Sequence, residues 1–312
     1  SDVAGMTPTK TWYFKTMKVG NNYVANMRNE DYFDHGDSLY KNSDGKLTYL
    51  LGSYTIREYS APTGYTVDGG YLTSGGTVVE ANSTFFVKLE GNNGVPVLRY
   101  SNNLSDPELK KDEVPVRGGY KLEKQDWSTG ATAEGDASLA GAEFDLYYLG
   151  DGTDSNVSIK LDKDGDGLGE GTEYLPSDTT PIDHITVGED GTYTSSATYL
   201  GYGKYKVVET KSPEGYLLTS YDAALISKEF FVSDDTATVE VPVANYPFLG
   251  SFKIQKNDNE LKEAYAQGDS NLQTTFEIIN ASAHPVTVLN HTYAVGEAID
   301  IEGNGSTTFT TD

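Results

Sequence analysis

The apolar residues along the chain follow the pattern of short strands separated by turns. Stretches rich in Val, Ile, Thr, Tyr and Phe recur, as in Gly203–Glu209, Phe230–Val232 and Val239–Val243, and Gly, Asn, Asp or Pro interrupt them. No long segment has apolar residues at the helical spacing of three and four positions. The pattern therefore predicts an all-β protein, with room for a short helix in a loop.

One block of sequence occurs twice, which indicates two copies of one domain. Glu58 and Glu209 are each followed by Pro at +4, Gly at +6 and Tyr at +7. Downstream, the run Phe85–Val87 corresponds to Phe230–Val232, and a Val-rich stretch ending in Asn follows each. Such internal repetition is typical of tandem domains.

A third copy begins with the run Phe-Lys-Ile-Gln-Lys at 252–256, which resembles Tyr-Lys-Leu-Glu-Lys at 120–124. This copy reaches the end of the sequence without a Glu-x-x-x-Pro-x-Gly-Tyr block.

The links between copies are short, which favours an elongated array of domains with little independent tumbling. We predict a divergent first domain at 1–112, a second domain with an acidic loop insertion at 113–248, and the N-terminal part of a third, incomplete domain at 249–312.

Three polar residues of the second copy are predicted to point into its core. Lys124 lies two positions after Leu122 and Asn245 two positions after Val243, so each shares a strand face with that apolar residue. Glu209 likewise shares a strand face with its apolar neighbours. An unpaired charge in a low-dielectric interior is costly, so these groups are expected to meet.

Two outcomes of that meeting are open. One is a buried salt bridge with a hydrogen bond to Asn245. In the other, burial lowers the pKa of Lys124 and raises the pKa of Glu209, which leaves a neutral amine beside a neutral acid. Glu209 would then hydrogen-bond the Asn245 carbonyl, polarise it for attack by Lys124 and shuttle the proton as ammonia departs. The product is an isopeptide crosslink between the first and last strands.

Four separated runs of the second copy carry a family resemblance: Lys124–Asp126, Leu139–Tyr147, Val208–Tyr216 and Val243–Pro247. Together they resemble the B-type repeat domain of the collagen adhesin Cna, a domain type that also builds pilins and other surface proteins of Gram-positive bacteria. The resemblance implies a prealbumin-like (Ig-like) β-sandwich with a self-formed Lys–Asn isopeptide bond assisted by Glu. It assigns the bond to Lys124 and Asn245 and the catalytic role to Glu209.

The other copies match this pattern less completely. The Leu-Ala-Gly-Ala-x-Phe run is absent from the first domain, and its strand ends are ambiguous. In the third domain only the lysine matches, so no complete bond is expected there within this chain. The candidates are Glu58 as catalytic acid, Lys18 with Lys15 as its rival, Asn102 with Asn103 as its rival, and Lys256 in the third domain.

The insertion of the second domain contains a candidate calcium loop. Residues 162–173 fit the pattern D-x-[DN]-x-[DN]-G-x5-E, whose carboxylates suit a hard cation of calcium size. No amphipathic helices flank the loop, so a solvated acidic turn is the alternative. The candidate ligands are Asp162, Asp164, Asp166, Glu170 and Glu173.

Composition narrows the function classes. A formal net charge of −24 disfavours nucleic-acid and anionic-membrane partners. No apolar run reaches the roughly 18 residues of a membrane span, and Ser1–Lys10 has no signal-peptide core. The absence of Cys excludes disulfides and thiolate chemistry, and the four His have no metal-ligand spacing.

These observations predict a structural or adhesive stalk segment of a Gram-positive cell-surface protein or pilin, extracellular and attached to the cell wall. Neither a Tyr-Pro-Lys motif nor a Leu-Pro-x-Thr-Gly signal occurs, which weakens the pilin assignment. No multiple-turnover enzyme activity and no cofactor requirement are expected, with calcium as the candidate ion. Expected partners are a host surface or extracellular-matrix ligand, or neighbouring pilin subunits.

The alternative function is a carbohydrate- or host-protein-binding module that uses Trp12, Trp127 and the run Tyr193–Tyr205. A third and weaker hypothesis is glycoside hydrolysis by paired carboxylates.

Overall fold

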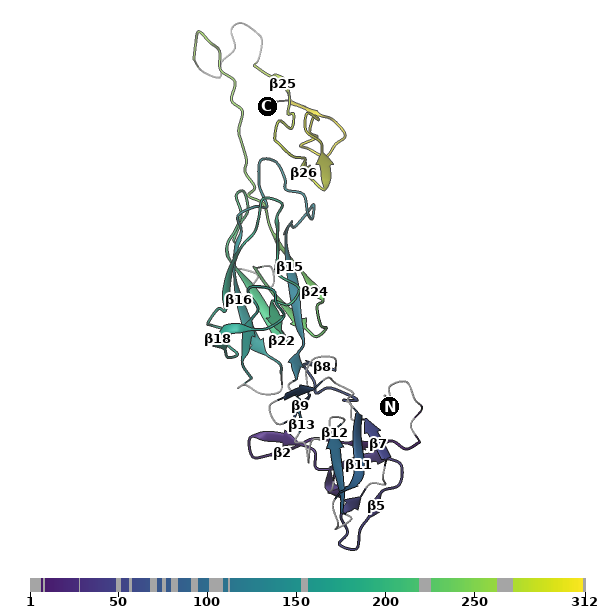
Figure 1. The fold of residues 1–312 in the computed structure, drawn as a ribbon. Helices are drawn as coiled ribbons and strands as arrows, with labels where there is room; N and C mark the ends of the chain where they lie inside the picture. The colour runs from purple at the N-terminus through teal and green to yellow at the C-terminus, as the bar shows by residue number, and fades with distance from the viewer. Residues whose placement is uncertain are drawn as a thin grey trace. The chain divides into compact units, whose positions relative to one another are not determined.

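The computed structural model describes the chain apart from residues 1–6, 8, 28, 49–51, 56–57, 68–71, 75–76, 80–83, 91–94, 101–108, 112, 153–156, 219–225, 263–271 and 311–312. Strands dominate, together with the one-turn 3-10 helix η1 (Glu30–Tyr32), so the all-β prediction is confirmed. The chain divides into two compact units, residues 1–114 and 115–312 (Figure 1). Within the described ranges, no helix is long and apolar enough to cross a membrane.

The first unit consists of small antiparallel sheets. One sheet has the order β12 (Val95–Tyr100), β11 (Thr84–Glu90), β7 (Gly52–Thr55), and another has β10 (Thr77–Val79), β9 (Leu72–Ser74), β13 (Leu109–Lys111). Two-stranded pairs are formed by β1 (Trp12–Phe14) with β4 (Phe33–Gly36), β2 (Met17–Val19) with β3 (Asn22–Val24), and β5 (Tyr40–Lys41) with β6 (Leu47–Thr48). The remaining strands are β8 (Tyr65–Thr66) and β14 (Val114–Pro115), which spans the boundary between the units in sequence.

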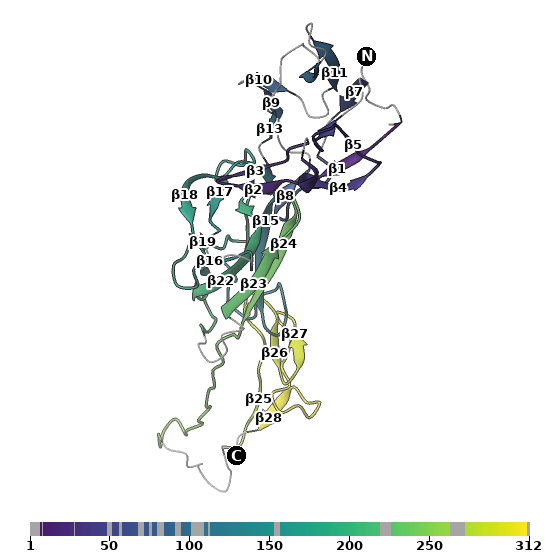
Figure 2. The ribbon, with the colours of Figure 1, turned by 90° about the horizontal axis from the view of Figure 1, so that it is seen from below.

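The second unit contains two sheets that share a core. In the first, β15 (Arg117–Asp126) pairs antiparallel with β20 (Thr192–Thr194) and β21 (Leu200–Gly201) and parallel with β24 (Thr238–Asn245). The second sheet has the order β19 (Asp183–Thr186), β16 (Glu143–Gly150), β22 (Gly203–Lys211), β23 (Ser227–Val232). The insertion adds the hairpin of β17 (Ile159–Leu161) and β18 (Glu170–Tyr174). Figures 1 and 2 show β24 lying along β15.

The core follows from strand alternation. Along β15, β16, β22 and β24, buried and more exposed residues alternate over most of each strand, because successive side chains point to opposite faces. Tyr120 and Leu122 of β15 thus belong to one buried cluster with Phe144 of β16, Val207 of β22 and Val243 of β24. Side chains from the two sheets therefore meet between them.

Residues 272–310 belong to the same unit and contact the loop between β15 and β16. They contain two small antiparallel pairs, β25 (Thr275–Glu277) with β28 (Thr308–Thr310) and β26 (Val286–Val288) with β27 (His291–Tyr293). The Gly135 amide donates to the Pro285 carbonyl at 3.0 Å, and the His284 amide donates to the Gly135 carbonyl at 2.9 Å. The Ala283 amide adds a bond to Asp136 Oδ1 at 2.8 Å. The second unit thus contains the predicted third domain and the predicted second domain apart from residues 113 and 114.

Candidate functional site: a buried lysine, glutamate and asparagine

Two sheets bring three polar side chains into the core of the second unit. Lys124 and Asn245 lie near the C-terminal ends of the parallel strands β15 and β24, where Lys124 is in register with Val243. Glu209 lies near the end of β22 in the opposite sheet. The three residues are 1%, 2% and 3% exposed for Lys124, Asn245 and Glu209 respectively. The alternation that buries their apolar neighbours buries these residues too.

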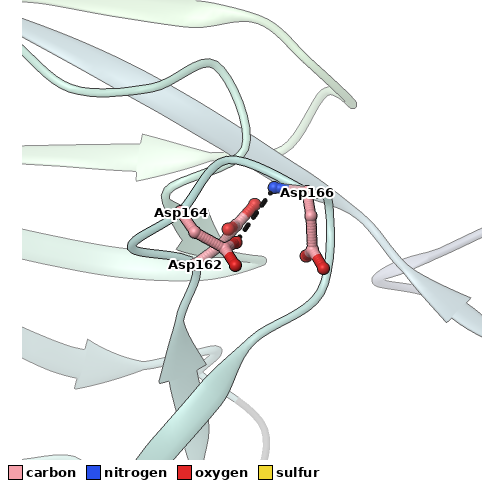
Figure 3. A group of neighbouring side chains, drawn as sticks. All are labelled: Asp162, Asp164 and Asp166. Carbon is pink, nitrogen blue, oxygen red and sulfur yellow. Dashed lines mark hydrogen bonds between the residues drawn. The ribbon is translucent and has the colours of Figure 1, made fainter.

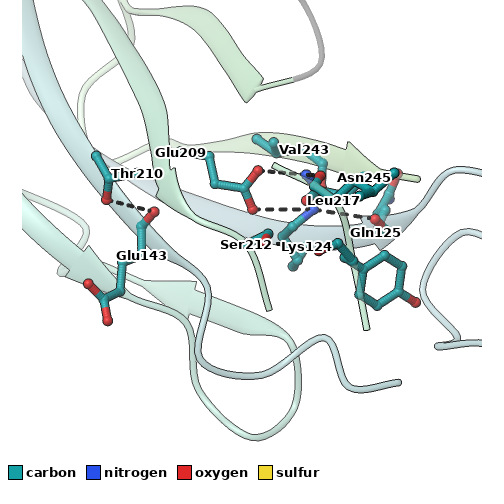
Figure 4. Close-up of polar contacts among 10 residues, drawn as sticks. Lys124, Gln125, Glu143, Glu209, Thr210, Ser212, Leu217, Val243 and Asn245 are labelled. Carbon is teal, nitrogen blue, oxygen red and sulfur yellow. Dashed lines mark hydrogen bonds and ion pairs between the residues drawn. The ribbon is translucent and has the colours of Figure 1, made fainter. Parts of the chain in front are cut away.

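Glu209 contacts both other side chains, one with each carboxylate oxygen (Figure 4). Its Oε1 lies 3.8 Å from Lys124 Nζ, and its Oε2 accepts a hydrogen bond of 2.8 Å from Asn245 Nδ2. Lys124 Nζ donates to the carbonyls of Val243 at 2.9 Å and Gln125 at 3.4 Å. A neutral amine has two N–H groups, so these two acceptors leave its lone pair available.

Burial favours the neutral form of both ionisable groups. Desolvation lowers the pKa of Lys124 to about 8, although Glu209 and Asp126 oppose the shift. Desolvation also raises the pKa of Glu209 above its usual value, against the opposing effects of Lys124 and Asn245. Both side chains are fully enclosed, and the cost of removing two charges from water can exceed the attraction between them.

The orientation of the Asn245 amide differs from the sequence prediction. The sequence analysis expected Glu209 to contact the Asn245 carbonyl oxygen, whereas the amide nitrogen faces Glu209 and also donates to the Leu217 carbonyl at 2.9 Å. The Leu217 carbonyl can only accept a hydrogen bond, so the amide nitrogen of Asn245 must be the atom that faces it. Within the described residues, Asn245 Oδ1 and Glu209 Oε1 are buried and accept no hydrogen bond.

Asp126 and Tyr216 also lie at this end of the core, and the sequence analysis gave neither of them a functional role. Asp126 is 2% exposed and accepts hydrogen bonds at Oδ1 from Ser128 and Thr129 and at Oδ2 from the Tyr216 hydroxyl. Asp126 is in register with Asn245. The tyrosine at +7 of the repeated block was a visible signal for such a contact.

Of the first-domain candidates, only the two lysines and Glu58 lie among the described residues. Lys18 lies exposed on β2 opposite Tyr23, and Lys15 is exposed as well. The β2–β3 pair is a two-stranded hairpin whose Val19, Tyr23 and Val24 are exposed as well, so Lys18 is not buried there. Glu58 is half-buried, while Asn102 and Asn103 lie outside the described residues.

The repeated turn itself is present in both units. The Tyr65 amide donates to the Pro62 carbonyl at 3.1 Å, as the Tyr216 amide does to the Pro213 carbonyl at 3.2 Å. The preceding glycines have φ of +83° and +86° respectively, a left-handed conformation that glycine adopts without strain. In the third predicted domain, Lys256 is exposed in a segment without strand structure.

The acidic insertion brings three of the five predicted calcium ligands together. Ligand oxygens of Asp162, Asp164 and Asp166 lie within 4.8 Å of one another (Figure 3). Glu170 instead accepts from the Lys163 amide at 2.9 Å, and Glu173 forms an ion pair with Lys160 at 3.5 Å. The two glutamates therefore have other partners in this conformation.

Asp162 accepts hydrogen bonds from several groups in and around this loop. It is buried, and its oxygens accept from the amides of Gly165 and Gly167 at 2.7 and 2.8 Å and from the Thr198 hydroxyl at 2.5 Å. Burial acts to raise the pKa of Asp162, but these hydrogen bonds outweigh it, and the pKa lies below its usual value. Arg117 joins the loop to β15 through bonds to the carbonyls of Thr198 and Lys160.

Calcium binding can be tested by melting. If the loop binds calcium, millimolar calcium raises the Tm of the chain relative to chelator, since a ligand at 100 times its Kd stabilises by about 2.7 kcal/mol. Asp164→Asn with Asp166→Asn should remove the shift while leaving the chelated Tm in place, because both aspartates are exposed. An equal Tm with calcium and with chelator would identify the loop as a solvated acidic turn.

The aromatic residues proposed for ligand binding divide between surface and core. Trp127 is 54% exposed and packs against Tyr246 at 5.0 Å between ring centroids. In the run Tyr193–Tyr205, by contrast, Tyr199 and Tyr205 are core residues, and Tyr193 packs against them. Tyr199 and Tyr205 thus fill the sandwich and are not available as stacking surfaces, whereas Tyr202 is half-buried and packs against Phe231.

In a comparison with known protein families, the second domain matches one family model. Residues 118–247 match the family model of the SpaA prealbumin-like fold domain. The match covers the segment on which the resemblance to Cna B-type domains was based, and that resemblance and the prealbumin-like fold are confirmed for it. In a comparison with curated proteins, none matches the chain.

Several solved structures of Gram-positive surface proteins are similar to parts of the chain. The TIE protein of Bacillus anthracis is 17% identical with a TM-score of 0.33, over 76% of this chain and 31% of that one. The pilus 2b backbone protein of group B streptococcus is 22% identical, TM-score 0.30, over 52% of each chain. The minor pilin GBS52 of Streptococcus agalactiae is 17% identical with a TM-score of 0.29, over 73% of this chain and 74% of that one. The chain thus spans about a third of the first and half of the second.

Proposed function

We propose that the chain is a structural or adhesive stalk segment of a Gram-positive surface protein or pilin, locked by an isopeptide bond between Lys124 and Asn245. The observation that carries the proposal is the enclosure of an amine, an amide and one carboxyl group that contacts both of them. The prealbumin-like family match of residues 118–247 supports it. Attachment to the cell wall, and a host ligand or neighbouring subunits as partners, belong to the same proposal.

The proposed reaction needs no other reactant. Neutral Lys124 Nζ attacks Cγ of Asn245 and forms a C–N bond, while Glu209 takes a proton from Nζ through Oε1. The carboxyl group returns a proton to Nδ2 through Oε2, the bond between Cγ and Nδ2 breaks, and ammonia leaves. Atoms and charge balance, and nothing is oxidised. Glu209 ends as it began, but Lys124 and Asn245 are consumed in forming the bond, so each chain carries out the reaction once and no multiple-turnover activity is proposed.

The bond would change how the domain carries force. Tension enters at the N-terminal end of β15 and leaves after β24, and these two strands are parallel neighbours. A crosslink from Lys124 to Asn245 carries that tension across the strands and bypasses the intervening residues. In the chain-entropy model, a crosslink closing about 100 residues also stabilises a domain by about 4 to 5 kcal/mol. Unlike a disulfide, the amide cannot be reduced.

The intact mass of the purified chain tests the proposal. Each isopeptide bond removes one ammonia, so the wild-type chain should weigh one ammonia less than its sequence. Lys124→Met should restore the full mass, whereas Lys121→Met on the exposed side of the same strand should not. A wild-type mass equal to that of the unmodified sequence would refute the crosslink.

A further inference from the structure

The turn that follows Glu209 contacts the same asparagine as Glu209 does. Asn245 Nδ2 has two hydrogens, and both are used: one is donated to Glu209 Oε2 and the other to the Leu217 carbonyl. Leu217 stands at +8 from Glu209, directly after the tyrosine of the repeated block. The Leu217 side chain is half-buried, and the contact with Asn245 is made by the backbone carbonyl of Leu217, so it depends on the position of the backbone.

Hydrogen bonds to the chain beyond β24 hold this turn on both sides of the contact. The Leu217 amide donates to the Tyr246 carbonyl at 2.9 Å, and the Phe248 amide donates to the Gly215 carbonyl at 2.8 Å. The Tyr216 hydroxyl reaches across to Asp126 Oδ2 at 2.9 Å. The turn is therefore joined to β15 and to the segment after Asn245.

Gly215 allows the turn to approach this closely. Its φ is +86°, and a Cβ at this position would lie 2.5 Å from Ala137 Cβ and 3.0 Å from Ala137 Cα. Any larger residue would have to move the turn away from the loop between β15 and β16. Such a movement would carry the Leu217 carbonyl with it.

We infer that the turn from Pro213 to Leu217 is a positioning element for the crosslinking reaction. The Leu217 carbonyl holds the leaving nitrogen of Asn245 against Glu209, and the Gly215 and Tyr216 contacts hold that carbonyl in place. This inference rests on the proposed function for its reaction and on the observed contacts for its geometry. It gives the Pro-x-Gly-Tyr part of the repeated block a role distinct from that of its glutamate.

The rate of crosslinking tests the role of the turn. In a time course after cell-free synthesis of the full chain, loss of ammonia should be slowed about a hundredfold by Gly215→Ala, since a displacement of about 1 Å can cost that much. Tyr216→Phe should slow it less. Gly141→Ala is the matched control, with φ +76° and no atom within 4 Å of the added Cβ. Tyr205→Phe also loses a buried hydroxyl bond, at a position away from the centre.

Circular dichroism distinguishes slow chemistry from failure to fold. The inference is supported if folded Gly215→Ala and Tyr216→Phe crosslink slowly while both controls keep the wild-type rate. It is overturned if the turn variants crosslink as fast as their controls. Tyr216→Phe keeps the test decisive if Gly215→Ala does not fold.

A second measurement separates this inference from the proposed function. In the Lys124→Met chain no bond can form, and the Asn245 side-chain NH2 protons should exchange slowly with water by NMR because both are hydrogen-bonded. Adding Gly215→Ala should speed that exchange, whereas adding Gly141→Ala should not. Equal exchange in both double variants would overturn the positioning role, whatever the wild-type mass shows. A wild-type chain that keeps its ammonia, with exchange as expected, would refute the crosslink alone.

Discussion

Replacing Glu209 by glutamine is expected to leave a folded chain that retains the mass of one extra ammonia relative to wild type. Glutamine preserves the shape of the side chain, but it cannot take a proton from Lys124 Nζ and return it to Asn245 Nδ2. The uncrosslinked domain should lose about 4 to 5 kcal/mol of stability, which corresponds to a Tm lower by on the order of 10 to 20 °C. Intact mass and thermal melting measure the two effects.

Glu189→Gln provides the matched control, because it makes the same glutamate-to-glutamine substitution at an exposed position. It should lose ammonia like the wild type and melt at nearly the same temperature, as surface substitutions usually do. A Glu209→Gln chain that still loses ammonia would show that the carboxyl group is not the proton shuttle. A drop in Tm without a change in mass would indicate a buried salt bridge in place of a crosslink.

Under tension, the wild-type chain should extend less than the Lys124→Met chain by the length of the bypassed residues. The bond would exclude about 120 residues between Lys124 and Asn245 from extension, which corresponds to about 400 Å of fully extended chain at 3.3 to 3.6 Å per residue. Single-molecule pulling between the chain termini measures this difference directly. It is the largest expected effect, because a covalent bond changes contour length and not only the force at which strands separate.

Lys121→Met controls for the removal of a lysine from the same strand. Lys121 lies three positions earlier on β15, partly exposed and paired with Glu240 at 3.6 Å. Its loss should leave the wild-type extension unchanged. Equal extension of the wild-type and Lys124→Met chains would mean that force passes through the whole domain, and the stalk mechanism would not hold.

The burial of the three candidate residues could be predicted from the sequence because strand alternation is a local property. The period of two put Lys124, Glu209 and Asn245 on the same side as their apolar neighbours, and the structure has all three in the core. The same reasoning was weaker for Lys18, where Phe14 and Thr16 give a looser pattern. Burial there requires other parts of the fold to pack over the β2–β3 hairpin, and most residues of these two strands are exposed.

In the candidate calcium loop, too, part of the arrangement could be predicted from the sequence and part depends on strand pairing. The spacing of Asp162, Asp164 and Asp166 was visible in the sequence, and a tight loop brings residues so close in the chain together in space. Glu170 and Glu173 lie on the following strand β18, so their partners depend on how that strand pairs with β17. Pairing placed Glu173 beside Lys160.

By itself, the amino-acid sequence determined the strand-rich class, the repeated block and the inward direction of the Lys124, Glu209 and Asn245 side chains, since each depends on residues a few positions apart. Tertiary structure alone decided which end of the Asn245 amide meets Glu209. That choice depends on the Leu217 carbonyl, which approaches from another strand connection and can accept a hydrogen bond but not donate one. The partners of an amide are set by its neighbours in space, and no periodicity along a strand specifies them.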